Sequence, residues 1–271
     1  MLKQLGFTII GVEVVLMFNR FLASIGIGSA KIDTLLEKAR YAPGEEVRGI
    51  VKIQGGSVEQ RIETIQLSVM TEYIRESNDS KITQHGEIGR YHVSAPFTLQ
   101  AGENREVPFS FQLPHQTPLT IGRTPVWVKT ELAVIGGVDP GDNDRIEVVP
   151  TTPMNTVLEA LDLLGFRLRK AECEYSSRLG GKMPFIQELE FVPTTQFRGQ
   201  LDELEVMFYP SDRELELVLQ IDRRARGLSS FFAEAMDMDE SFVRIRLTNE
   251  QLAAGPNAIA HQLSDTIARF A

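Results

Sequence analysis

Few residues in this chain of 271 amino acids have a type and spacing that could perform chemistry. Its four histidines are His85, His92, His115 and His261. None of them pairs with another at helical spacing, and none has a carboxylate at the interval of a metal site. No serine lies in the nucleophile elbow of a hydrolase. The sequence therefore predicts no enzymatic activity, no catalytic residue, no metal site and no cofactor.

Cys173 is the only cysteine, so the chain cannot form an internal disulfide. Its acidic neighbours Glu172 and Glu174 should raise the pKa of its thiol, which is the opposite of what a nucleophile needs. We expect Cys173 to be a half-buried strand residue.

Two acidic segments have some features of a calcium loop. Residues 139–145 (DPGDNDR) combine three aspartates and an asparagine with a glycine, and residues 237–240 (DMDE) hold three acidic side chains. A calcium loop also needs a glutamate at its twelfth position, where the first segment has Pro150. The second segment lacks both the glycine and the glutamate. Because aspartate and asparagine bond to their own backbone in turns, we expect a turn at each segment.

The best candidate for a binding site is a segment rich in arginine and phenylalanine. Its residues are Arg223, Arg224, Arg226, Phe231 and Phe232. Guanidinium groups bind carboxylates and phosphates, and aromatic residues beside arginines are typical of interface hot spots. Ser229 and Ser230 are both suitable N-cap residues for a helical turn at this place. The interpretation that we favour over docking is that these arginines pair with the acidic turn at residues 237–240.

The overall charge argues against partners that are themselves polyanions. The formal net charge is −9 at pH 7, and 42% of the residues are hydrophobic, which is sufficient for a buried core. Nucleic acids and anionic membranes carry negative charge, so we expect neither as a partner. A single cysteine gives no sign of an oxidising compartment. We therefore expect a cytoplasmic protein whose partners are other proteins.

An apolar run occupies residues 5–18. It is too short to span a bilayer, it contains Glu13, and no signal-peptide cleavage site follows it closely. Met17 offers a second starting position. We interpret residues 1–16 as an N-terminal extension upstream of the true start. The alternative is an exported or membrane-anchored protein that uses this apolar run.

Residues 32–150 show the period of two that is typical of strands with one wet and one dry face. In residues 126–135 (VWVKTELAVI), one face carries Val126, Val128, Thr130, Leu132 and Val134. The pattern recurs in residues 47–53, 62–73 and 105–114, with turn signals at residues 43–44 (PG) and 55–56 (GG). Many short strands separated by turns predict an antiparallel sandwich, so we assign residues 17–150 to an N-terminal β-sandwich.

A short amphipathic helix is predicted after Pro150. Thr156 and Glu159 have the spacing of a capping box, and Gly165 lies where a helix would stop. The apolar stripe of this helix consists of Val157, Leu161 and Leu164. We place the domain boundary here.

Alternating runs resume at residues 167–175, 185–193, 201–210, 214–222 and 241–248. A terminal helix is predicted to start near Pro256, with Ile259, Leu263 and Ile267 on one face. We assign residues 151–271 to a C-terminal β-sandwich with a helical linker and a terminal helix. The predicted fold class is all-β, with two antiparallel β-sandwich domains, a short linker helix and a C-terminal helix.

Several segments carry a resemblance to known proteins. Residues 32–73, from IDTLLEKARYAPGEEV to the run IETIQLSVMTEY, resemble the opening of arrestin-like domains. More closely, the chain resembles the stage-zero sporulation-control protein M family of bacteria. The segments that carry this similarity are residues 21–34 (FLASIGIGSAKIDT), 126–150, 158–175 (LEALDLLGFRLRKAECEY), 201–210 and 219–241. The resemblance as a whole covers the chain from about residue 17 to residue 246.

This resemblance implies two arrestin-like β-sandwiches without known enzymatic activity. It also implies a regulatory role in the control of entry into sporulation, exerted as an adaptor that binds other proteins. The alternative function is a membrane-recruited or ligand-binding β-sandwich module in stress response or cell morphology. Exposed strand edges leave association between copies of the chain open as well.

Overall fold

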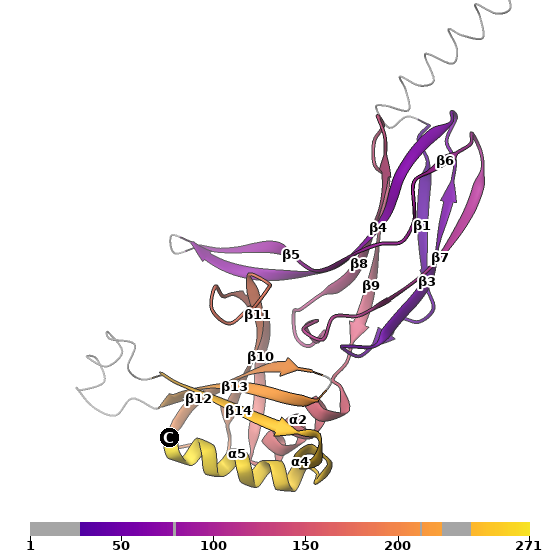
Figure 1. The fold of residues 1–271 in the computed structure, drawn as a ribbon. Helices are drawn as coiled ribbons and strands as arrows, with labels where there is room; N and C mark the ends of the chain where they lie inside the picture. The colour runs from indigo at the N-terminus through magenta and orange to yellow at the C-terminus, as the bar shows by residue number, and fades with distance from the viewer. Residues whose placement is uncertain (1–27, 78–79, 212, 224–239) are drawn as a thin grey trace, which may run out of the picture.

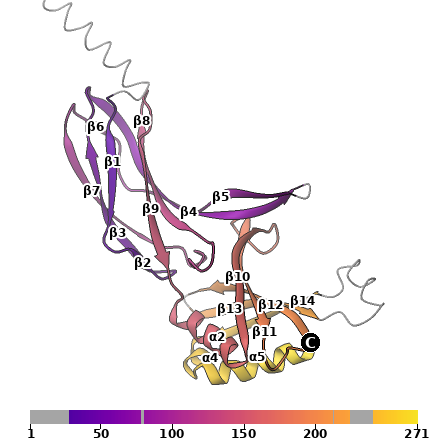
Figure 2. The ribbon, with the colours of Figure 1, turned by 180° about the vertical axis from the view of Figure 1, so that it is seen from behind.

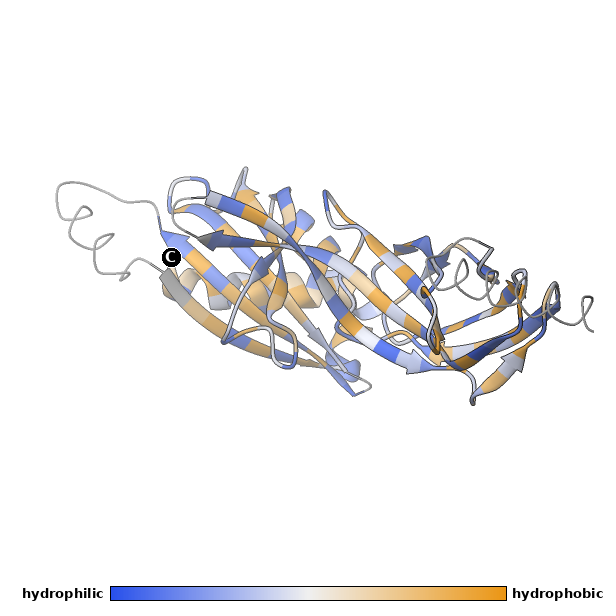
Figure 3. Ribbon diagram, turned by 90° about the horizontal axis from the view of Figure 1, so that it is seen from above, coloured by the Kyte–Doolittle hydropathy of each residue, from blue (hydrophilic) through white to orange (hydrophobic). Residues whose placement is uncertain are grey.

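The computed structural model describes residues 28–77, 80–211, 213–223 and 240–271. It consists mostly of β-strands, which form a three-stranded sheet and an eleven-stranded sheet that continues through both halves of the chain (Figure 1). Hydrophobic and hydrophilic residues alternate along many of these strands (Figure 3). The predicted all-β class is therefore confirmed. The alternation is the pattern on which that prediction was based.

The first half of the chain is a sandwich of two sheets. Its strands are β1 (Lys31–Leu36), β2 (Arg40–Tyr41), β3 (Glu46–Gln54), β4 (Gln60–Ser77), β5 (Ser80–His92), β6 (Phe97–Leu99), β7 (Asn104–Gln112), β8 (Val126–Val134) and β9 (Gly141–Val148). The small sheet has the order β1-β3-β7, and the part of the large sheet that belongs to this half has the order β4-β8-β9-β2, with β5 and β6 also paired to β4. Neighbouring strands in the small sheet are antiparallel, as predicted.

Strand β8 shows how the sequence pattern determines the packing. Its inward residues are buried at alternate positions from Val126 to Val134, as predicted. Burying a valine or leucine side chain contributes roughly 1.5–3 kcal/mol, so such a row accounts for much of the stability of the sandwich. The one polar member, Thr130, accepts a hydrogen bond of 2.8 Å from the Thr34 hydroxyl on β1. The buried hydroxyl is therefore satisfied across the two sheets.

Helix α2 (Thr152–Leu163) occupies the predicted position of the linker helix but begins earlier than predicted. Its N-cap is Thr151, whose hydroxyl accepts a hydrogen bond from the backbone N–H three residues later. The predicted capping box of Thr156 and Glu159 is therefore wrong. Pro153 lies in the first turn of this helix, where proline is tolerated because a backbone N–H there would have no helical partner.

The second half contains one curled sheet covered by helices. Its strands are β10 (Phe166–Tyr175), β11 (Phe185–Pro193), β12 (Leu201–Pro210), β13 (Glu214–Arg223) and β14 (Glu240–Thr248), and its other helices are α4 (Asn249–Ala253) and α5 (Pro256–Phe270). Figures 1 and 2 show the helices together along one side of the sheet. The predicted stripe of Ile259, Leu263 and Ile267 on α5 is buried in the same core as Val157 and Leu161 of α2. Helices thus supply the layer opposite the sheet, which the strand pattern did not indicate.

The two halves are joined by more than the linker. A parallel bridge between Ile74 and Glu174 connects β4 to β10, so the large sheet passes from one half to the other. The β4–β5 hairpin also extends over the second half (Figures 1 and 2). The boundary placed at residue 150 stays a prediction about independent folding units. No helix in the ranges described above has the length and apolar character needed to cross a membrane.

Candidate functional site: a groove of aromatic and arginine side chains

The structure locates only one residue of the predicted binding segment. Arg223 is the last residue of β13; it pairs with Leu201 of β12 and is exposed. Arg224, Arg226, Phe231 and Phe232 lie outside the described residues, as do Ser229, Ser230 and residues 237–239 of the predicted acidic turn. The last residue of that predicted turn, Glu240, is the first residue of β14. A binding role for this segment stays a prediction.

A groove lies on the outer face of the sheet beside β14, the strand that follows this segment. Its walls are Tyr175 at the end of β10, residues 176–179 of the β10–β11 connection, and Phe242 and Arg244 on β14. We call it the β14 groove. Its volume is about 580 Å³, which lies within the range of small binding sites.

The alternation of β14 explains why a phenylalanine lines this groove. Ile245 and Leu247 point into the core, so Phe242, Arg244 and Arg246 must point outward. The side chain of Phe242 is 55% exposed, and Tyr175 is 42% exposed. Two neighbouring aromatic residues that remain in contact with water are typical of an interaction surface.

The second wall of the groove is held in place by hydrogen bonds. The Leu179 backbone N–H donates to the Ser176 hydroxyl at 3.0 Å, and the Tyr209 hydroxyl donates to the Leu179 carbonyl at 2.9 Å. Leu179 also packs on the outer apolar cluster of Ile186, Met207 and Val218. The connection between β10 and β11 is therefore a fixed wall beside β14.

The charged side chains around the β14 groove are arginines. Arg178 and Arg244 line it, and none of the acidic residues that the structure describes does. Arg244 pairs with Glu216 at 2.5 Å, and Arg246 pairs with the same carboxylate at 2.9 Å. These hydrogen bonds, with that of Arg246 as the larger cause, hold the pKa of Glu216 below its usual value. The negative charge of Glu216, and near Arg246 that of Glu214, largely offsets these two arginines, so Arg178 is the unpaired cation of the groove among the described residues.

A third arginine comes from the first half of the chain. The guanidinium of Arg75 on β4 lies 4.5 Å from the centre of the Tyr175 ring, in a cation–π arrangement. This contact lies one residue beyond the bridge between Ile74 and Glu174. The position of Tyr175 therefore depends on the junction between the two halves.

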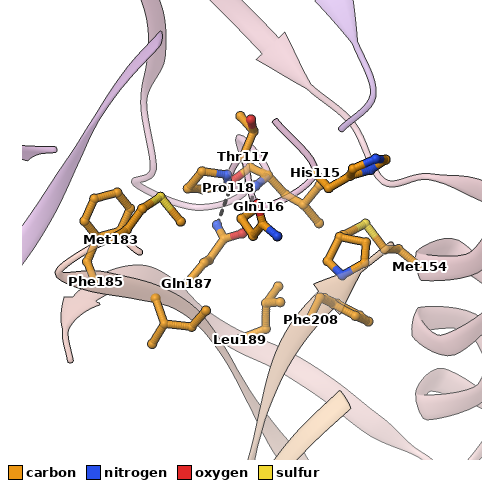
Figure 4. A pocket seen from close by; sticks show the side chains of 13 residues that line it. His115, Gln116, Thr117, Pro118, Met154, Met183, Phe185, Gln187, Leu189 and Phe208 are labelled. Carbon is orange, nitrogen blue, oxygen red and sulfur yellow. Dashed lines mark hydrogen bonds between the residues drawn. The ribbon is translucent and has the colours of Figure 1, made fainter. Parts of the chain in front are cut away.

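That junction is fixed by a buried amide, Gln187 on β11. Its Oε1 accepts from the Leu119 backbone N–H at 2.8 Å, and its Nε2 donates to the Leu119 carbonyl at 2.7 Å and to the Thr124 hydroxyl at 3.2 Å. Figure 4 shows the amide pointing toward the segment that contains Thr117 and Pro118, with the hydrogen bonds dashed. The cavity around it measures about 20 Å³, which is room for about one water molecule. The space in Figure 4 is thus a packed seam that is too small for a ligand.

Cys173 lies in this junction and does not have the properties of a nucleophile. It is only 3% exposed, so it is more buried than predicted, and it clusters with Phe185 and Tyr73, whose rings stack at 5.0 Å. Burial raises the pKa of the thiol to about 12, with a smaller contribution from Glu188. The predicted direction is confirmed, but burial rather than the flanking Glu172 and Glu174 is the cause.

The predicted turn at residues 139–145 is shorter than expected. Asp139 accepts from the Val134 backbone N–H at 2.7 Å and closes a turn, but β9 already begins at Gly141. Asp142 then accepts from the Thr34 backbone N–H at 2.8 Å, which connects β9 to β1. Strand pairing with β8 overrides the turn preference of these residues. The structure contains no group of three metal-ligating side chains within the residues it describes.

Asp144, next along β9, should make stability depend on pH. Burial, and then the charges of Asp142 and Asp33, raise its pKa from 3.8 to about 6. Its Oδ2 is buried and has no hydrogen-bond partner in the described ranges. A carboxyl group that holds its proton more tightly when folded stabilises the fold at low pH, and this stabilisation is lost as the pH rises through about 6.

We therefore expect Asp144→Asn to melt at a higher temperature than the natural protein at neutral pH. The difference in Tm should shrink as the pH falls from about 6 to 3.8. Thermal unfolding followed by circular dichroism across this range measures it. Asp265→Asn, a matched change at an exposed position on α5, is the control. A difference in Tm that is the same at every pH would show that the charge of Asp144 is not its cause.

Comparison with known proteins identifies the family. Residues 18–225, well over half of the chain, match the family model described as SpoOM protein. The chain belongs to this family. It is 43% identical over 236 residues to the sporulation-control protein spo0M of Bacillus subtilis (strain 168), covering 87% of this chain and 92% of that relative. It also matches the crystal structure of Spo0M from Bacillus subtilis with a TM-score of 0.81 and 37% identity, over 90% of this chain and 100% of that one.

The family resemblance stated from the sequence is thereby confirmed. The SpoOM match includes β10 and its connection to β11, which form one wall of the β14 groove, and it ends before β14. This groove was not predicted from the sequence. Phe242, Arg244 and Arg246 occupy alternate positions of one strand, and this alternation could have placed all three on its outer face.

Proposed function

We propose that this protein is a non-enzymatic regulator of the sporulation-control type that acts in the cytoplasm by binding other proteins. Membership of the SpoOM family and the name of its Bacillus subtilis relative support the regulatory role. The buried thiol of Cys173 and the packed seam at Gln187 offer no reactive group in an accessible cavity.

The observation that carries the proposal is the composition of the β14 groove. Tyrosine and arginine are among the side chains that most often dominate the energy of protein interfaces, and phenylalanine is enriched in interfaces as well. Here Tyr175, Phe242 and Arg178 lie together on a fixed wall and a regular strand. A partner would meet a surface that needs little ordering, which lowers the cost of association.

The proposal is tested by recovering crosslinked partners from the native host with a variant that combines Arg178→Glu and Phe242→Ala. We expect the recovery of specific partners to fall at least about tenfold, since truncating one hot-spot residue typically costs about 2 kcal/mol. The control variant combines Arg61→Glu and Leu163→Ala, two exposed positions elsewhere on the molecule. Equal recovery with both variants, each folded as judged by circular dichroism, would refute a role for the groove.

A further inference from the structure

The β14 groove is a cationic site on an acidic protein. The whole chain has a formal net charge of −9, yet the charged residues that line the groove are Arg178 and Arg244. Arg75 adds a third positive charge against the Tyr175 ring. A local field of one sign that opposes the overall charge selects ligands of the opposite sign.

One of these arginines is available for a new ion pair. Arg178 has no ion pair or hydrogen bond with any residue that the structure describes. Arg244 already bonds to Glu216, which it shares with Arg246, and its guanidinium has further N–H donors that a second carboxylate could use. The guanidinium fork can hold a carboxylate through two parallel hydrogen bonds, which fixes its orientation as well as its distance.

Because part of the groove is apolar, its ligand should carry an apolar group as well as negative charge. Tyr175, Leu179 and Phe242 line it, and Phe242 and Tyr175 keep about half of their surfaces in water. An aromatic or large aliphatic side chain inserted between them would remove this surface from water. Burial of that kind contributes about 25 cal/mol for each Å².

A second copy of the chain fits this site poorly. A twofold contact whose axis passes through the groove would place it against the same groove of the other copy, so Arg178 and Arg244 would face the arginines of that copy. Like charges placed opposite each other destabilise such a contact. A membrane surface or a nucleic acid would also extend beyond the groove, over a protein whose net charge is negative.

We propose that the β14 groove binds a short acidic protein segment that carries one aromatic side chain, with its carboxylates on Arg178 and Arg244 and its ring between Tyr175 and Phe242. This inference rests on the proposed adaptor function and adds the chemistry of the partner. A segment of this kind is small enough to remain within the groove, away from the acidic surface around it.

Fluorescence anisotropy with a labelled peptide, Ser-Glu-Glu-Phe-Glu-Glu-Ser, tests the proposal on the full chain. We expect Arg178→Glu and Phe242→Ala each to weaken binding about tenfold, which corresponds to about 1.4 kcal/mol. Arg178→Glu is expected to fold normally, because that side chain has no ion pair in the described structure. Arg61→Glu, at an exposed position on β4, should leave the affinity unchanged.

Two further peptides and a vesicle separate the alternatives. Replacing the glutamates of the peptide with lysine should abolish binding to the natural protein and restore part of it with Arg178→Glu. Replacing its phenylalanine with serine should weaken binding.

Three results would overturn the proposal. The acidic peptide could bind equally well to Arg178→Glu, the lysine peptide could bind as tightly as the acidic one, or phosphatidylserine vesicles could bind through the same arginine. If partner recovery depends on the groove but the acidic peptide does not bind, this inference fails and the adaptor function stands.

Discussion

Replacing Gln187 with leucine is expected to lower the free energy of unfolding by about 3 kcal/mol. The amide makes three hydrogen bonds across the seam, and leucine can make none of them. The Leu119 carbonyl keeps a bond of 2.8 Å from the Ile121 backbone N–H, but the Leu119 N–H would remain buried without its amide partner. An unsatisfied buried donor costs about 1–3 kcal/mol, which is more than the net contribution of a typical hydrogen bond. Equilibrium unfolding in urea measures the change.

A matched substitution shows whether this effect belongs to the seam. Gln54→Leu makes the same chemical change at an exposed position on β3 and should alter the free energy of unfolding by less than about 0.5 kcal/mol. If Gln187→Leu were as mild as Gln54→Leu, the two halves would not depend on this amide. The Gln187 amide would then not be what fixes the junction.

Replacing Gly86 with alanine is expected to destabilise the protein by about 2 kcal/mol. A Cβ atom at this position would lie 2.3 Å from Cε1 of Phe185, which is closer than real Cβ contacts allow. Phe185 is fully buried and stacked on Tyr73, so its ring has little freedom to move away. Gly86 thus allows the β4–β5 hairpin to pack closely on the second half. Urea unfolding of the variant measures the loss.

A double-mutant cycle with Phe185→Leu isolates this contact. Leucine is smaller than phenylalanine, so Gly86→Ala should cost clearly less in the Phe185→Leu background than in the natural protein. Thr83→Ala, at an exposed position on β5, controls for a general effect on the hairpin. Strictly additive costs of Gly86→Ala and Phe185→Leu would contradict a direct clash between these residues.

Local patterns in the sequence predicted the elements that depend on local rules. The alternation of β8 and the stripe of Ile259, Leu263 and Ile267 on α5 were both confirmed, because burial follows the period of a strand or a helix. The start of α2 was missed, because Thr151 and Thr156 are both acceptable N-caps and only the course of the preceding chain decides between them. Helix α4 was missed as well, although Thr248 and Gln251 form a capping box.

The junction and the groove depend on contacts between distant segments. Gln187 bonds to a backbone segment 68 positions away, and nothing in its own neighbourhood distinguishes it from an ordinary surface glutamine. Tyr175 meets Arg75 and lines a groove with Phe242 only because the large sheet curls and passes from one half to the other. No periodic pattern within a single segment predicts contacts between segments that are far apart in the sequence. The arginines and aromatics that the sequence singled out by type belong to the segment before β14, and a binding role for that segment stays a prediction.

The central claim is that partners bind at the β14 groove, and crosslinking at one position tests it most directly. A photo-crosslinking amino acid at Ser177, on the wall of the groove, is expected to capture one specific partner in the native host. Capture should be lost with Arg178→Glu and competed by the acidic phenylalanine peptide, and the same amino acid at Thr98 on β6 should not capture this partner. Capture of the same partner from Thr98 but not from Ser177 would contradict the account.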